Sequence, residues 1–453
     1  MKKIVLALIL LPFLSKAQQG DEAMIKKISD EILRNGNAYE LLRQLTKQVG
    51  GRLAGSPQFA KAIQWGKLTL EQQGAEKVWL QECMVPHWVR GGQDKAMIVE
   101  VDKKKNSKSL DVLALGNSLG NGTVTAEVLA VADFDELERR KNEIKGKIVF
   151  YNKAFDPTLI KTFEAYGQTV VYRGAGASRA AKYGAVGIMI RSMTESVAND
   201  PHTGGMRYND SFPKIPAIAV GPRDADYVWE LSKKSGFKMS MTTQGHFLPD
   251  TIGHNVIGML QGSEFPDEII TVGGHLDSWD VNEGAMDDGT GIVHTIEIMR
   301  ALKAIGYKPR HTIRFVLFAN EENGLRGGTK YAEEAKAKGE KHIFALESDA
   351  GGFTPRGFSM ELNKEQLAKA RNWIPLLAAY GTNEISNDGG GADVGPLNRL
   401  LGTPVGELMP DSQRYFDFHH ARTDVLENVN KRELLLGAVN MAALIYLIDK
   451  YGL

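Results

Sequence analysis

Three short apolar runs in this chain each lead directly into residues of the kind that bind metal ions. The runs and the residues after them are 268–274 before His275, 311–319 before Glu321 and Glu322, and 343–346 before Asp349. Short β-branched runs that alternate with helical segments predict strands of a mostly parallel sheet flanked by helices. Ligands of such sheets collect outside the carboxyl ends of the strands, so we expect these side chains to meet at one edge.

Asp287 and His420 complete a set of two histidines and three carboxylates, which is typical of a two-zinc hydrolase. Asp287 lies in the glycine-rich segment 284–291, where the backbone can come close to an ion. We therefore expect Asp287 to bridge two zinc ions. The other predicted ligand pairs are His275 with Asp349 and Glu322 with His420.

Two further carboxylates are predicted as catalytic residues beside these ligands. Glu321 precedes Glu322, and neighbouring side chains after a strand point in different directions. Glu321 can therefore stay off the metal and act as the general base for a metal-activated water. Asp277 lies two residues after His275, and we expect it to accept the second ring N–H of that histidine.

Each of these residues also has an ordinary explanation when taken alone. An Asp or Glu after a strand is more often a helix cap or a solvated turn residue. A single histidine is more often a core or surface residue than a ligand. Recurrence at successive strand ends is what favours the metal site. His419 precedes His420, so spacing alone leaves the last ligand open between the two.

The length of the chain and a change in its composition near residue 107 predict two domains. Its 453 residues are more than one hydrophobic core usually supports. Residues 107–246 open with a segment rich in Gly, Asn and Ser, and they contain no carboxylate–histidine cluster of their own. We therefore expect an insert at 107–246 within a discontinuous domain formed by residues 18–106 and 247–453.

The N-terminus has the pattern of a secretory leader. Lys2 and Lys3 precede an apolar run at 4–14, and small residues lead up to the Ala17–Gln18 bond, where we expect cleavage. The predicted leader is residues 1–17, which implies export to the periplasm or the extracellular space. An uncleaved anchor is the alternative, but the apolar run is too short to span a bilayer. We expect no membrane partner once the leader is removed.

Charge and cysteine content exclude several other classes of protein. Lys plus Arg equals Asp plus Glu at 55 each, so no basic field favours nucleic acid as a partner. Cys83 is the only cysteine, which rules out an internal disulfide. We expect it to be buried and inert because no catalytic motif surrounds it.

These motifs resemble those of the di-zinc aminopeptidase superfamily and, within it, the carboxypeptidase Q (plasma glutamate carboxypeptidase) group. The resemblance covers nearly the whole mature chain. The segments that carry it are 51–56, 86–91, 201–204, 274–281, 284–289, Glu321–Glu322, 347–351 and 418–424. It implies a zinc-exopeptidase α/β fold, with a mixed, mostly parallel sheet and an inserted protease-associated β/α domain.

By this resemblance the zinc ligands are His275, Asp287, Glu322, Asp349 and His420, and the general base is Glu321. The last ligand of the family is the histidine four residues before an aspartate, which selects His420 over His419 and makes Asp424 its expected partner. The resemblance also implies a cis peptide bond between Asp287 and Asp288, and homodimer assembly.

The resemblance implies hydrolysis of dipeptides or short peptides, as a dipeptidase or carboxypeptidase. The alternatives are an aminopeptidase acting on longer peptides and a non-catalytic binding protein that keeps the fold. Asp393, in a segment similar to a substrate-pocket loop, either meets the α-ammonium of a substrate or caps a helix. His202 of the insert either faces the active site or is a loop histidine without a role.

Overall fold

The computed structural model describes residues 4–120 and 122–453, and the side chains from residue 19 onward within those ranges. The predicted leader begins at residues 1–3, which lie outside the described residues. The leader continues into helix α1 (Ile4–Asn35). The side chains of α1 are described from residue 19 onward, beyond the leader. Further along α1, the buried Asp21 carboxylate accepts hydrogen bonds from Tyr446 and Tyr451, both at 2.7 Å. These bonds tie α1 to the C-terminal helix α13 (Lys431–Tyr451).

The first sheet is mixed, with parallel pairing among its central strands β12, β11, β13 and β16. Antiparallel neighbours flank this centre on both sides. The predicted mixed, mostly parallel sheet is therefore confirmed. In spatial order its strands are β1 (Lys77–Val89), β10 (His246–Leu260), β12 (His311–Phe318), β11 (Phe265–His275), β13 (Lys341–Glu347), β16 (Val405–Pro410), β14 (Pro355–Glu361) and β15 (Glu384–Ser386).

Helices cover both faces of this sheet because its strands are apolar on both sides. Phe315 and Leu317 of β12 belong to the larger core, while Val316 and Phe318 belong to a smaller core on the opposite face. Besides α1 and α13, the helices that contribute to the larger core include α2 (Ala38–Gln44), α3 (Pro57–Gln72) and α7 (Thr290–Ala304). Those of the smaller core are α8 (Arg326–Lys338) and α11 (Gly395–Leu401).

Two features of the sequence are explained by this packing. Within the described residues, α13 alone is long and apolar enough to cross a bilayer, and 83% of its most apolar window is buried inside the protein. It therefore has the environment of a core helix. Cys83 lies buried in β1, as predicted, and burial raises the pKa of its thiol to about 12.

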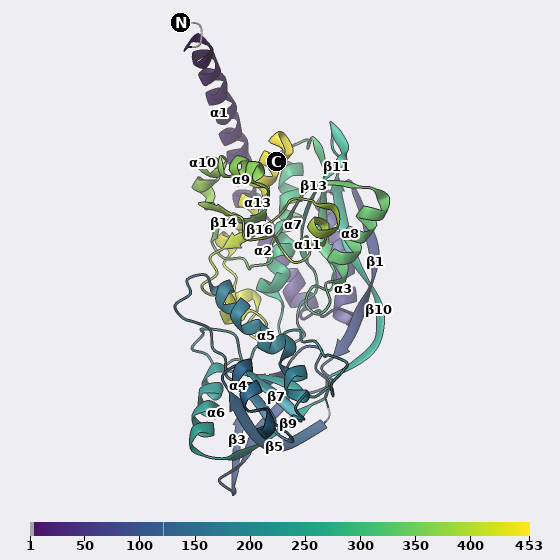
Figure 1. The fold of residues 1–453 in the computed structure, drawn as a ribbon. Coiled ribbons are helices and arrows are strands. Elements are labelled where there is room, and N and C mark those ends of the chain that lie inside the picture. Colours follow the sequence, from purple (N-terminus) through teal and green to yellow (C-terminus); the bar gives the residue numbers. More distant parts are fainter. Residues whose placement is uncertain (1–3, 121) are drawn as a thin grey trace.

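A second mixed sheet forms the other half of the molecule. In spatial order its strands are β3 (Lys104–Leu110), β2 (Lys95–Val101), β9 (Phe237–Thr243), β5 (Gly122–Val131), β6 (Ile148–Tyr151), β7 (Gly187–Arg191), β8 (Ala217–Val220) and β4 (Val112–Ala114). Its helices are α4 (Phe134–Arg139), α5 (Thr162–Ala181) and α6 (Pro222–Lys234). Figure 1 shows the two sheets along the long axis of the molecule, with α5 between them.

The second sheet begins earlier in the chain than the predicted insert at 107–246. β2, at Lys95–Val101, pairs with β3 and β9 and so belongs to this sheet. A strand pattern does not reveal which sheet a strand joins, and this explains the difference. The antiparallel strands β1 and β10 connect the two halves, with register from Lys77 opposite Met259 to Val89 opposite His246. We propose residues 95–243 as the inserted domain.

The remaining short helical segments lie in loops of both halves. They are η1 (Leu45–Val49), η2 (Lys141–Glu143), η3 (Ala285–Gly289), α9 (Lys364–Arg371), α10 (Ile374–Leu377), η4 (Ala378–Tyr380), α12 (Tyr415–Phe418) and η5 (Leu426–Asn428).

Candidate metal centre

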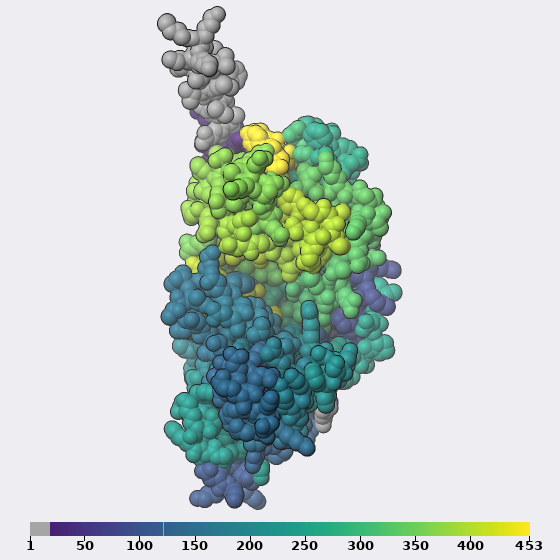
Figure 2. Space-filling view, viewed as in Figure 1, coloured from purple at the N-terminus to yellow at the C-terminus, as the bar shows by residue number. Residues whose placement is uncertain are grey.

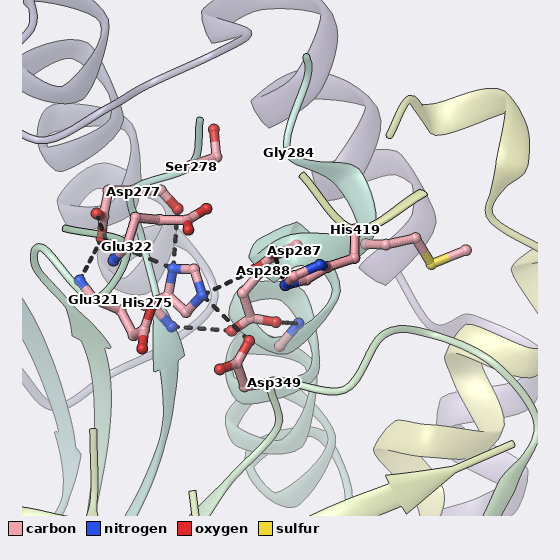
Figure 3. Close-up of polar contacts among 12 residues, drawn as sticks. His275, Asp277, Ser278, Gly284, Asp287, Asp288, Glu321, Glu322, Asp349 and His419 are labelled. Carbon is pink, nitrogen blue, oxygen red and sulfur yellow. Dashed lines mark hydrogen bonds and ion pairs between the residues drawn. The ribbon is translucent and has the colours of Figure 1, made fainter. Parts of the chain in front are cut away.

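The three predicted strand ends lie side by side at one edge of the first sheet. β11 ends at His275, and its parallel neighbours β12 and β13 lead into Glu321 and Asp349. Parallel neighbours present their carboxyl ends at the same edge. Figure 3 shows the side chains of His275, Asp287 and Asp349 pointing toward one another at this edge.

His275 is fully buried and faces two carboxylates. Its Nε2 atom lies 3.2 Å from Oδ1 of Asp287 and 3.2 Å from Oδ1 of Asp349. The ligand-type atoms of these three residues all lie within 4.8 Å of one another. This is one group that can hold a metal ion.

The second oxygen of Asp287 faces the other predicted pair. Its Oδ2 atom lies 3.1 Å from Nε2 of His420, and the same nitrogen lies 3.1 Å from Oε2 of Glu322. Asp287 thus stands between His275 with Asp349 on one side and Glu322 with His420 on the other. This is the position expected of a carboxylate that bridges two ions.

The donor set fits zinc, which takes imidazole nitrogen and carboxylate oxygen. Oε1 of Glu322 is buried and is not hydrogen-bonded to a described residue. Buried polar atoms ordinarily have a partner, so this oxygen indicates that another group belongs here. A metal ion would provide that partner.

The charges of the centre also favour a bound cation, because carboxylates outnumber histidines there. Burial and the charge of Asp287 raise the pKa of Glu322 to about 7. Burial lowers the pKa of His420, but the charges of Glu322 and Asp287 outweigh it and raise that pKa to about 9. Ionisable groups with strongly shifted pKa values are characteristic of functional sites. Divalent cations would relieve this excess of negative charge.

His419 lies close enough to be considered as an alternative ligand. With Asp287 and His420 it forms a second group whose ligand atoms lie within 4.8 Å of one another. Its Nε2 atom is 3.9 Å from Oδ2 of Asp287, compared with 3.1 Å for His420. The two imidazole rings are stacked, with centroids 3.6 Å apart. The shorter distance favours His420, and so does the family motif.

Asp277 supports the centre through different atoms from those predicted. Nδ1 of His275 lies 3.0 Å from the backbone carbonyl of Asp277 and 3.8 Å from its carboxylate. The carboxylate instead accepts the backbone N–H groups of Glu321, at 3.0 Å, and Glu322, at 3.3 Å. Asp277 therefore orients the histidine with its main chain and holds the glutamate pair with its side chain.

The predicted pairing of Asp424 with His420 is wrong, because the partners of Asp424 are backbone N–H groups. The Asp424 carboxylate accepts three backbone N–H groups, from Ala285 at 3.1 Å, Met286 at 2.6 Å and Asp287 at 3.2 Å. The sequence around Asp424 does not reveal these contacts, because the loop at 285–287 lies far away in the sequence. Asp424 thus fixes the backbone that presents Asp287.

Asp288 holds the other side of the same loop. Its carboxylate accepts the backbone N–H groups of His275 and Gly291, both at 2.9 Å. Gly291 is required here because a Cβ atom would lie 1.9 Å from the carbonyl oxygen of Ser348. The predicted cis peptide bond between Asp287 and Asp288 is present.

Arg52 is a positioning residue that the sequence analysis did not identify. Its buried guanidinium donates to the backbone carbonyls of Leu276 at 2.5 Å, Glu283 at 2.8 Å and Gly284 at 3.0 Å. These carbonyls belong to the segment between the predicted ligands His275 and Asp287. Arg52 lies in a glycine-rich turn, and such a turn gives no signal for a buried arginine that binds backbone carbonyls. Segment 51–56 nevertheless carried part of the family resemblance.

The insert reaches the centre through a loop and a helix. The backbone N–H of Thr203 donates to the carbonyl of His420 at 3.0 Å, and a Cβ atom at Gly204 would lie 2.6 Å from Nδ1 of that histidine. From α5, Nη1 of the buried Arg173 lies 3.3 Å from the same Nδ1. The environment of His420 thus depends on both halves of the molecule.

The two predicted substrate-binding residues are both buried. His202 lies in the loop of Thr203, and its Nδ1 has no hydrogen-bond partner among the described residues. Burial lowers the pKa of His202 to about 3. Asp393 is fully buried between Glu347 and Gly328, and neither of its oxygens has a partner within the described chain. The Asp393 carboxylate makes no cap bond to helix α11 within the described chain, so the cap alternative is wrong, while a contact between Asp393 and a substrate ammonium stays a prediction.

Comparisons with known proteins identify the family of the chain. The model of peptidase family M28 matches residues 255–445, which contain all five predicted ligands. The mouse carboxypeptidase Q is 34% identical over 414 residues, covering 91% of this chain and 85% of the relative. The human carboxypeptidase Q is 35% identical over 416 residues, with the same coverage.

Solved structures extend the likeness to the fold. A peptidase M28 precursor from Shewanella amazonensis is 32% identical and superposes with a TM-score of 0.90, covering 95% of this chain and 97% of that one. A zinc aminopeptidase from Bacillus subtilis, at 19% identity, covers 91% of this chain and 95% of its own with a TM-score of 0.65, and so shares the fold. The chain therefore belongs to peptidase family M28, in the carboxypeptidase Q group, and is a zinc-dependent metallopeptidase.

Proposed function

We propose that this metallo-exopeptidase hydrolyses dipeptides or short peptides with two zinc ions bound at the centre. The observation that carries the proposal is the place of Asp287 between two ligand pairs, with one oxygen toward each. The residues proposed to hold the ions are His275, Asp287, Glu322, Asp349 and His420.

Zinc, when bound, supplies a Lewis acid for the scissile carbonyl and lowers the pKa of water to about 7. Glu321 is assigned to proton transfer: its carboxylate takes a proton from the attacking water and returns it to the leaving amine. Burial raises the pKa of Glu321 well above its ordinary value, and Asp349 and Glu322 reinforce this against the opposing charge of His275. A carboxylate with a raised pKa is better suited to hold a proton between these two steps.

Two neighbours keep this base in register with the ligands. Asp277 accepts the backbone N–H groups of both Glu321 and Glu322, so the base and the adjacent ligand cannot shift independently. Arg52 holds the carbonyls of the segment that joins His275 to Asp287. Prearranged groups of this kind lower the cost of reaching the reactive geometry.

Two parts of the proposal rest on sequence and resemblance. Export after cleavage near Ala17–Gln18 rests on the leader pattern, and homodimer assembly rests on the family resemblance. The likeness to carboxypeptidase Q favours a carboxypeptidase or dipeptidase over the alternative, an aminopeptidase on longer peptides. A non-catalytic binding protein is disfavoured because Glu321 and the whole predicted ligand set are present.

Peptide hydrolysis with and without zinc tests the proposal. Purified protein should hydrolyse dipeptides with free termini, lose this activity to a zinc chelator and regain it when zinc is returned. Cleavage of N-blocked peptides would identify a carboxypeptidase, cleavage of C-terminal amides an aminopeptidase, and cleavage of doubly free dipeptides alone a dipeptidase. Hydrolysis that persists unchanged after chelation would contradict the zinc mechanism. Zinc-loaded protein that hydrolyses none of these peptides would favour the binding-protein alternative.

A further inference from the structure

A cavity of about 750 Å³ lies where the insert meets the C-terminal half of the first sheet. Ile160, just before α5, and Phe163, in the first turn of α5, belong to one wall, and strands β14, β15 and β16 contribute to the other. In Figure 2 the surface is hollowed between the blue insert and the green and yellow-green C-terminal segments. The cavity thus has one wall from each half of the molecule.

Glu407 of this lining lies on β16, next to β13, the strand that leads to Asp349. Its cross-strand partner is Glu347, two residues before the ligand Asp349. Alternate residues of a strand share a face, and Glu407 and Met409 both line the cavity. Burial raises the pKa of Glu407 well above its ordinary value, and the charges of Asp349, Glu347 and Glu321 reinforce this.

Among the described residues, no side chain forms an ion pair with the Glu407 carboxylate. The hydroxyl of Ser359, opposite Glu407 in the sheet, donates instead to the carbonyl of Gly389 at 2.8 Å. The two cationic side chains of the lining form ion pairs with other carboxylates of the lining. Lys161 pairs with Asp388 at 3.4 Å, and Arg356 pairs with Asp411 at 2.7 Å. Three carboxylates of the lining form no ion pair with any described residue, namely Glu164, Glu384 and Glu407.

The walls of the cavity are largely apolar, through Phe163, Phe358 and Met409. A lysine or arginine side chain combines an aliphatic stem with a cationic end, and so matches apolar walls beside an unpaired carboxylate. The α-ammonium of a peptide has the same charge but needs no cavity of this size. We propose that this cavity binds a cationic side chain of the peptide substrate, with Glu407 as its counter-ion, an inference that rests on the proposed function.

Matched dipeptides test this subsite. Lys-Ala is compared with norleucyl-Ala, and Ala-Lys with Ala-norleucine, because norleucine keeps the aliphatic stem and lacks the ammonium. In one of the two positions kcat/KM for the lysine peptide should exceed that for norleucine by about ten- to a hundredfold, the range for hydrogen bonds to charged groups. Glu407→Gln should remove most of this ratio.

Asp411→Asn provides the matched control, since it removes the same charge from the same cavity at a carboxylate already paired with Arg356. It should leave the lysine-to-norleucine ratio within about twofold, because exposed charges are screened. The wild-type ratio itself needs no variant, so the proposal stays testable if Glu407→Gln does not fold.

Each outcome decides between specific alternatives. Hydrolysis of the norleucine peptides without preference for lysine would overturn the subsite and leave the proposed function standing. Equal losses for lysine and norleucine peptides in Glu407→Gln would mean that Glu407 binds the α-ammonium, and would also overturn it. Zinc-loaded protein that hydrolyses none of the peptides would overturn the proposed function and the subsite with it.

Discussion

Replacing Glu321 by glutamine should lower kcat by about 10²- to 10⁴-fold, the usual contribution of a positioned proton-transfer group. The amide keeps the shape of the side chain but cannot take a proton from water. Zinc content should stay near the wild-type value, because Glu321 is assigned as a base rather than a ligand. Steady-state kinetics on a dipeptide, together with elemental analysis of the same preparation, measures both quantities.

Glu322→Gln is the matched control, with the same chemical change at the neighbouring residue. Oε2 of Glu322 lies 3.1 Å from Nε2 of His420, so this variant should lose zinc from one site. Loss of zinc in Glu321→Gln with both ions retained in Glu322→Gln would mean that the two roles are reversed. Full activity in Glu321→Gln would remove the proposed mechanism.

Arg52→Ala should lower the free energy of unfolding by about 3–5 kcal/mol, because each buried polar group left without its partner costs about 1–3 kcal/mol. The change leaves three buried carbonyls, those of Leu276, Glu283 and Gly284, without their donor. Because these carbonyls lie between His275 and Asp287, zinc affinity should fall as well. Urea unfolding followed by circular dichroism, and zinc titration of the folded protein, measure the two effects.

Two further variants sharpen the Arg52 prediction. Arg52→Lys keeps the charge but cannot present the planar fork of donors, so it should recover only part of the stability. Arg43→Ala removes an exposed arginine whose partner is Glu40 one turn away, and it should change unfolding little. An Arg52→Ala protein as stable as Arg43→Ala would show that the carbonyl contacts are not needed.

Local patterns predicted the centre of the fold because they depend on neighbours in the sequence. The apolar runs before His275, Glu321 and Asp349 became β11, β12 and β13, which are adjacent and parallel. Once these strands pair, the geometry of a parallel sheet brings their carboxyl ends together. Spacing left the last ligand open between His419 and His420, and the family motif selected His420.

Contacts between distant loops were beyond what the sequence could predict. Asp424 binds the backbone at 285–287 rather than His420, and the carboxylate of Asp277 binds the Glu321–Glu322 backbone rather than the ring of His275. Main-chain partners of this kind leave no residue-type signal. Glu407 was missed for a related reason, because it lies within a short strand and gains its importance only from the cavity beside it.

Anomalous diffraction at the zinc absorption edge, on crystals of the zinc-loaded protein, tests the central claim most directly. The account predicts two zinc peaks about 3.5–4 Å apart, with Asp287 coordinated to both. One peak should also contact His275 and Asp349, and the other Glu322 and His420. A single peak, a peak bound by His419 in place of His420, or peaks remote from Asp287 would contradict the assignment.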